Sequence, residues 1–128
     1  MRFLLDTHAL LWWAGDDRRL KRAERDAIGD EDSIVWVSAA SIWEISIKRS
    51  LGRIELDAAD LERELERNGF LELPMTWQHA ERAGSLPRHH DDPFDRMLIA
   101  QAQAEQFVLV SYDPAFRDYD VALRPTPD

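Results

Sequence analysis

The chain has 128 residues, of which 45% are apolar, so it is long enough for one domain with a buried core and too apolar for a disordered chain. Its formal charge of −9 argues against non-specific adhesion to nucleic acid. It has no cysteine, which excludes disulfides and thiolate sites and fits the cytoplasm. No apolar run approaches the roughly 20 residues that cross a bilayer, and the N-terminus does not read as a signal peptide. We therefore expect a single cytoplasmic domain over residues 1–128, with no membrane association.

Short apolar runs alternate with helical periodicity, which is typical of an α/β domain with parallel strands. The first of these runs, Phe3-Leu4-Leu5, is continuously apolar and predicts a strand buried on both faces. In the first half we predict, in chain order, a strand at 2–6, a helix capped by Thr7 and ending at Gly15, a charged helix at 20–28, a strand at 34–37, a helix capped by Ser38 or Ser41 and ending before Gly52, and a polar-faced helix at 57–68.

The second half repeats this alternation. Asp92 and Pro93 together predict the start of a helix, because an acidic cap and a proline in the first turn both favour one. The elements predicted here are a strand at 70–73, a helix at 76–83, a loop at 85–92, a helix from 93 to about 104, a strand at 107–110, a turn at 111–114 and an edge strand at 121–123.

Four acidic residues fall at junctions between the predicted strands and helices. Asp6 and Asp113 follow strands, whereas Glu44 and Asp95 lie in the first turns of helices. Ligands of open parallel sheets bind outside the carboxyl ends of the strands. The sheet can therefore gather all four carboxylates at one end. Crowded carboxylates repel each other unless a hard cation such as Mg²⁺ or Mn²⁺ binds them, and such an ion can activate water for phosphodiester hydrolysis.

Each acid also has a purely structural interpretation. Asp6 can simply end a strand, Asp95 can complement a helix dipole, and Asp113 is a common turn residue before proline. Glu44 can form a helix-surface pair with Lys48, four residues later. The hypothesis of an active site therefore depends on all four acids converging.

Four segments in order resemble the PIN domains, and most of all the VapC-type ribonuclease toxins of bacterial toxin–antitoxin pairs. These segments are 4–12 (LLDTHALLW), 38–45 (SAASIWEI), 92–102 (DPFDRMLIAQA) and 109–116 (LVSYDPAF). They are colinear and span nearly the whole chain. The resemblance implies a three-layer α/β/α sandwich with a central, mostly parallel sheet and an endoribonuclease activity that depends on Mg²⁺ or Mn²⁺.

The resemblance also implies roles for individual residues. The family's four acids fall on Asp6, Glu44, Asp95 and Asp113, and the first, third and fourth would hold the metal. Thr7 and Ser111 would orient the carboxylates from a second shell; Ser111 stands where the family usually has threonine. An antitoxin segment would cover the site, and a homodimer and a toxin–antitoxin hetero-oligomer are expected. A surface of charge −9 favours a partner segment rich in Arg or Lys.

Other residues have weaker signals. Arg96 can contact RNA phosphate or pair with Asp92, and we favour the pair. Lys48 is a further candidate for RNA contact. We do not expect a histidine metal site at His89 or His90, because no further ligands stand at suitable spacing. We interpret the basic residues of segment 18–25 as a solvated helix face, with a patch that guides RNA as the second interpretation. Trp12 and Trp13 are either packing residues or interface residues.

Two alternatives to a nuclease remain open. The same fold can serve as a binding or regulatory module in which the acids are idle. A phosphotransfer domain also uses an aspartate after its first strand, but phosphatases of that type require a second acid two residues later, where this chain has His8.

Overall fold

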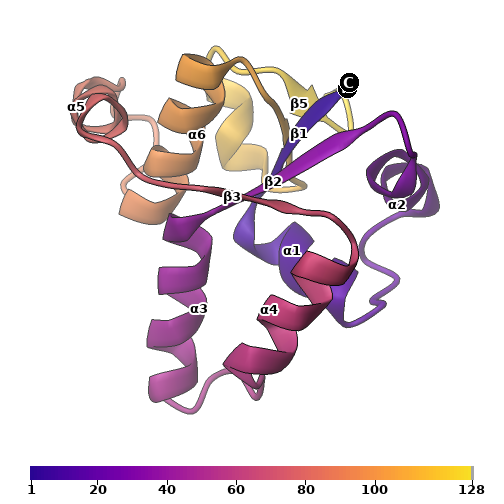
Figure 1. Cartoon of the computed structure of the whole chain (residues 1–128). Coiled ribbons are helices and arrows are strands. Elements are labelled where there is room, and N and C mark those ends of the chain that lie inside the picture. Colours follow the sequence, from indigo (N-terminus) through magenta and orange to yellow (C-terminus); the bar gives the residue numbers. More distant parts are fainter. Residues whose placement is uncertain (128) are drawn as a thin grey trace.

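The computed structural model describes residues 1–127, and at its centre lies a five-stranded sheet whose paired strands are all parallel (Figure 1). The strands are β1 (Arg2–Leu5), β2 (Ile34–Ser38), β3 (Leu71–Leu73), β4 (Val108–Val110) and β5 (Leu123–Arg124), in the spatial order β3-β2-β1-β4-β5. Leu5 of the central strand is in register with Val37 of β2 and with Val110 of β4. The carboxyl ends of these three strands therefore meet at one end of the sheet.

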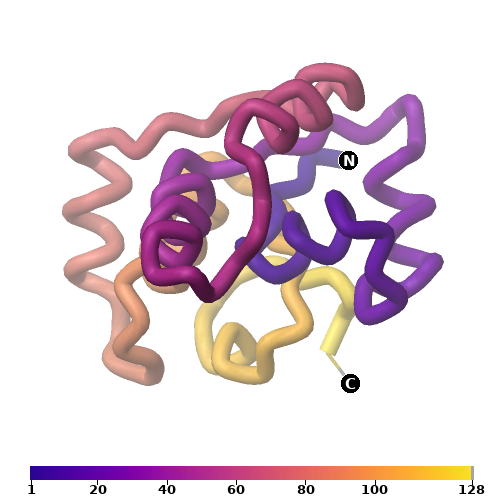
Figure 2. Tube along the Cα trace, turned by 90° about the horizontal axis from the view of Figure 1, so that it is seen from below, coloured from indigo at the N-terminus to yellow at the C-terminus, as the bar shows by residue number. Residues whose placement is uncertain are grey.

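Helices cover both faces of this sheet. They are α1 (Thr7–Ala14), α2 (Arg22–Gly29), α3 (Ala39–Ser50), α4 (Ala58–Arg67), α5 (Trp77–Ser85), α6 (Pro93–Glu105) and the short 3₁₀ helix η1 (Pro114–Asp118). Figure 2 shows α2 and α5 on opposite sides of the molecule. No helix within residues 1–127 combines the length and apolar character needed to traverse a bilayer.

Two cores lie on the two sides of the sheet, because successive side chains of a strand point to opposite faces. Phe3 and Leu5 join a core with residues of the first four helices, whereas Leu4 joins a second core with α6 and η1. All three side chains are at most 1% exposed. The prediction of a first strand buried on both faces is confirmed, and so is the three-layer α/β/α sandwich.

Side-chain caps begin most of the helices. Ser38, Asp57, Thr76 and Asp92 each accept a hydrogen bond from a backbone N–H in the first turn of α3, α4, α5 or α6. The prediction that Thr7 caps the first helix is wrong. Asp6 caps α1 instead, because its carboxylate accepts the N–H of Ala9 at 2.7 Å.

The other differences from the predicted elements are local. The sequence predicts a turn at 111–114, where in the structure Asp113 caps η1. The charged helix α2 begins at Arg22 rather than at residue 20, since Leu20 is buried in the preceding loop. The last strand is Leu123–Arg124 and not 121–123, because its register with β4 is set by Leu109 and Val110.

Candidate active site

The four predicted acids lie around the carboxyl end of the sheet. Asp6 follows β1 directly, and Asp113 follows β4 after two residues. Glu44 stands in the second turn of α3, and Asp95 in the first turn of α6, and these two helices pack against each other. Four different elements therefore place carboxylates around this end of the sheet.

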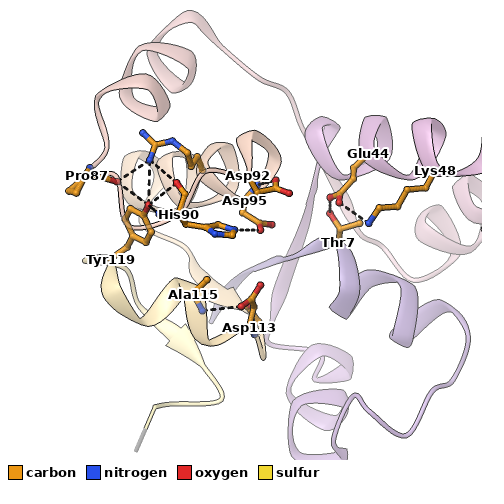
Figure 3. Close-up of polar contacts among 12 residues, drawn as sticks. Thr7, Glu44, Lys48, Pro87, His90, Asp92, Asp95, Asp113, Ala115 and Tyr119 are labelled. Atoms are coloured by element: carbon orange, nitrogen blue, oxygen red, sulfur yellow. Dashed lines mark hydrogen bonds and ion pairs between the residues drawn. The ribbon is translucent and has the colours of Figure 1, made fainter. Parts of the chain in front are cut away.

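Asp95 and Asp113 form the centre of this region together with His90. One ligand atom from each of the three side chains lies within 4.8 Å of the other two, and His90 Nε2 lies 2.8 Å from Asp95 Oδ2. In Figure 3 the carboxylates of Asp95 and Asp113 turn toward one another. All three side chains are partly exposed, so the cluster is open to a ligand.

The sequence reasoning missed His90. The sequence shows no further ligands at suitable spacing for a histidine metal site, whereas in the structure His90 approaches the cluster from the loop before α6. Its backbone N–H donates to Tyr119 Oη at 2.9 Å, which holds that loop against the end of η1. The sequence indicates only that His90 stands five residues before Asp95. Whether that spacing brings the two side chains together depends on the conformation of the loop between them.

Asp6 is buried next to this cluster, with 4% of its surface exposed. Burial raises its pKa above the usual value, the neighbouring charge of Asp113 raises it further, and hydrogen bonds from the Ser111 hydroxyl and the Ala9 amide oppose the shift. Ser111 also accepts the backbone N–H of Asp113 at 3.1 Å. Ser111 thus contacts the carboxylate of Asp6 and the backbone of Asp113, and its role in orienting the carboxylates stays a prediction.

Glu44 is buried on the α3 side and is held by two side chains. Its Oε1 accepts the hydroxyl hydrogen of Thr7 at 2.7 Å, and its Oε2 pairs with Lys48 Nζ at 3.0 Å (Figure 3). The ion pair of Glu44 with Lys48 that the structural interpretation expects is therefore present. It lies at the candidate site, so it does not separate the two interpretations of Glu44. Asp95 is near enough to Glu44 for the charge of Glu44 to raise its pKa.

The electrostatics of Asp95 show how crowded the negative charge is. The pKa of Asp95 is raised to about 6, because burial and the charges of Asp92 and Glu44, which raise it, outweigh the hydrogen bond from His90, which lowers it. In the same pair, the hydrogen bond to Asp95 raises the pKa of His90. Carboxylates with raised pKa values gain most from a bound cation, which replaces the proton as the source of positive charge.

The preference for an ion pair between Arg96 and Asp92 is wrong. Arg96 is 7% exposed, and its guanidinium donates to four backbone carbonyls, those of Ala83, Leu86, Pro87 and His90, at 2.9–3.2 Å. Arg96 therefore holds the loop before α6 against α6 itself. Its two terminal nitrogens are engaged in these bonds, so Arg96 is a structural residue and we no longer assign it an RNA contact.

Comparison with known proteins agrees with this geometry. The PIN domain family model matches residues 3–122. This chain belongs to the PIN-domain family. A curated PIN relative, Ribonuclease VapC22 of Mycobacterium tuberculosis, is 30% identical over 119 residues, which are 91% of this chain and 90% of the relative. The resemblance to VapC-type proteins that the motifs indicate is thereby confirmed.

Solved structures share the PIN fold at low sequence identity. VapBC2 from Rickettsia felis, bound to a DNA fragment from its promoter, aligns with a TM-score of 0.71 at 15% identity and covers 97% of this chain and 98% of that one. A toxin–antitoxin complex from Klebsiella pneumoniae aligns at 0.66 and 16%, with 98% of both chains covered. FitAcB from Neisseria gonorrhoeae aligns at 0.63 and 18%, covering 94% of this chain and 95% of that one.

Proposed function

We propose that this PIN-domain protein is an endoribonuclease that depends on Mg²⁺ or Mn²⁺. The observation that supports the proposal is the crowding of carboxylates near the carboxyl end of the sheet: Asp95 and Asp113 have ligand atoms within 4.8 Å of one another, the charge of Asp113 acts on Asp6, and that of Glu44 acts on Asp95. The relative from Mycobacterium tuberculosis is a ribonuclease, which supports RNA as the substrate.

The donor set fits a hard divalent cation. Asp6, Asp95 and Asp113 offer carboxylate oxygens, the atoms that Mg²⁺ and Mn²⁺ prefer, and His90 adds a nitrogen that suits Mn²⁺ better than Mg²⁺. A bound ion would stabilise negative charge on the phosphate and make a water molecule more acidic. Asp95 and Asp113 are the first ligands that we assign, because a carboxylate oxygen of one lies within 4.8 Å of a carboxylate oxygen of the other.

The remaining residues position these groups. We propose that Glu44, fixed by Thr7 and Lys48, orients the attacking water through the lone pairs that those two partners leave free. Thr7 and Ser111 act as positioning residues, because each donates to one acid. Lys48 is partly exposed and its ammonium has three donors, so it can hold Glu44 and contact an RNA phosphate at the same time.

The test compares single variants of the acids with a matched surface variant. Asp6→Asn and Asp95→Asn are expected to lose RNA cleavage in Mn²⁺ by at least about 100-fold while remaining folded, since each removes a charge at the metal. Glu31→Gln removes an exposed carboxylate outside the site and should cleave like the wild type. Full activity in either aspartate variant would refute the proposal.

The second candidate is a binding module with idle acids. The high pKa of Asp95 disfavours it, since a protein gains nothing in stability from keeping such a group. Incubation of the protein with structured RNA, in Mn²⁺ or in EDTA, separates the two candidates. A binding module produces no fragments that depend on the metal.

We further propose that a cognate antitoxin inhibits this cytoplasmic enzyme and that the enzyme forms homodimers. A groove of about 390 Å³ between α3 and α4 is lined by apolar side chains such as Ile42 and Leu65 and by exposed Glu62 and Glu66. It therefore suits an amphipathic segment with Arg or Lys on its polar side. Co-purification with the product of a neighbouring small reading frame, followed by loss of RNA cleavage, tests the inhibition. Light scattering tests the dimer.

A further inference from the structure

A stripe of ring side chains and one arginine runs away from the acid cluster along α1. We call these four residues the α1 stripe: His8, Trp12, Tyr112 and Arg19. The ring centroid of Trp12 lies 5.9 Å from that of His8 and 5.6 Å from that of Tyr112, and the Arg19 guanidinium carbon lies 5.1 Å from the Trp12 ring. The stretch 8–19 and the distant residue Tyr112 thus lie side by side in one feature of the surface.

One end of the α1 stripe is at the candidate active site. His8 is exposed and stands in the first turn of α1, two residues after Asp6. Tyr112 stands between Ser111 and Asp113, the residues that follow β4. This end of the stripe is therefore next in the chain to Asp6 and Asp113.

The other end of the α1 stripe carries exposed positive charge. Arg18 and Lys21 are exposed, and within residues 1–127 neither has a carboxylate within 4.0 Å. Arg19 does pair with Asp17 at 2.8 Å, yet its guanidinium also lies over Trp12. Segment 18–25 has five basic residues and one acid, Glu24, which is buried, whereas the whole chain has a charge of −9.

The stripe is also held in place. The Tyr112 hydroxyl accepts the backbone N–H of Lys21 at 2.9 Å and lies 3.1 Å from Glu24 Oε2, to which it donates. This contact fastens the loop that carries the basic residues to the segment after β4. The rings and the cations consequently have a fixed arrangement before any ligand binds, which reduces the entropic cost of binding.

We infer that the α1 stripe binds a single-stranded stretch of RNA next to the scissile phosphate, with bases stacked on His8 and Trp12 and phosphates on Arg18 and Lys21. This inference rests on the proposed ribonuclease function. An exposed ring, His8, next to the half-buried ring of Trp12 and beside unpaired cations is the combination that single-stranded nucleic acid requires, and a duplex offers no free base to stack. An acidic peptide is a poorer occupant, because the carboxylates at the Asp6 end would repel it.

The test measures the affinity of short single-stranded RNA by fluorescence anisotropy in Mg²⁺, in an Asp95→Asn background that does not cleave. His8→Ala and Trp12→Leu should weaken binding about 5- to 100-fold, the range for loss of one stacked base, with the salt dependence unchanged. The double variant Arg18→Gln/Lys21→Gln should lower the slope of log affinity against log salt by about 1.4, at about 0.7 for each lost phosphate contact.

Matched controls have the same residue types elsewhere. Trp77→Ala removes a tryptophan that is 95% exposed, and Arg63→Gln/Arg67→Gln removes two exposed arginines of α4; neither should change RNA affinity. Because Trp12 packs partly against the core, the stability of Trp12→Leu is checked by a thermal melt. His8 is exposed, so the affinity of His8→Ala is the result that tests base stacking.

The outcomes separate this inference from the proposed function. Unchanged affinity in both His8→Ala and the Arg18/Lys21 double variant overturns the inference, even where the wild type cleaves RNA. Displacement of RNA by polyglutamate at equal concentration also overturns it, because the stripe would then be a site for an acidic protein. Loss of RNA binding in the stripe variants, with no cleavage by any form of the protein, sustains the inference and refutes the nuclease.

Discussion

Replacing Asp95 by asparagine should make the metal-free protein more stable. The Asp95 carboxylate is only 21% exposed and stands near the charges of Asp92 and Glu44, so ionising it in the folded protein costs free energy. Asparagine has nearly the same shape, carries no charge and can still accept the hydrogen bond from His90. The substitution therefore removes the electrostatic cost and keeps the contact.

The size of the effect follows from the pKa. A rise from 3.8 to about 6 is roughly two pKa units, and each unit corresponds to about 1.4 kcal/mol, so the upper limit is about 3 kcal/mol. Water at the partly exposed oxygens reduces this value, and we expect a gain of about 1–2 kcal/mol in the free energy of unfolding at pH 8. For a domain of this size, that is a rise in Tm of about 3–8 °C.

The sign of the pH dependence provides the control. A carboxyl group whose pKa is raised on folding destabilises the protein above its folded pKa, here about 6, and has no effect below its unfolded pKa. Urea unfolding of both proteins in EDTA should therefore show the advantage of Asp95→Asn at pH 8 and its disappearance by about pH 4. An Asp95→Asn protein that is equally stable or less stable than the wild type at pH 8 would refute the electrostatic reasoning.

Two further predictions concern the residues around the acids. Thr7→Val removes the hydroxyl that donates to buried Glu44, so cleavage should fall about 10- to 100-fold while the free energy of unfolding falls by about 1–3 kcal/mol; unchanged activity in a cleavage assay would contradict the positioning role. Arg96→Met should lower the free energy of unfolding by more than about 3 kcal/mol, because four backbone carbonyls lose their donor. Its counterpart Arg63→Met, on an exposed helix face, should change urea unfolding by less than about 1 kcal/mol.

Much of the fold was predictable because local signals and burial agree. The run Phe3-Leu4-Leu5 is apolar at every position, and only a strand covered on both faces can bury all three side chains. Asp92 followed by Pro93 marks the start of α6, because the cap and the proline act within a single turn. The four acids were found for a related reason. Parallel strands place their carboxyl ends together, so the order of elements alone brings the junctions into one region.

The sequence did not predict the cap of α1, the place of His90 or the contacts of Arg96. The first depends on which of two adjacent residues caps the helix, and the other two depend on the conformation of a loop. Asp6 and Thr7 both can cap a helix, and the choice is decided by the fact that Thr7 donates to Glu44 instead. His90 reaches Asp95 only because the preceding loop is fastened by Arg96. Arg96 itself looks like a surface residue in the sequence, since no local pattern predicts that a loop will surround a guanidinium with carbonyl oxygens.

The central claim is that these separate acids form one divalent-metal site that cleaves RNA. Its most direct test is a titration of the metal-free protein with Mn²⁺ by isothermal calorimetry, with RNA cleavage measured at each metal concentration. We predict saturable binding by the wild type, cleavage that rises in parallel with occupancy, and loss of both in Asp95→Asn and Asp113→Asn. Cleavage that persists without bound metal, or Mn²⁺ affinity that both variants retain, would contradict the account.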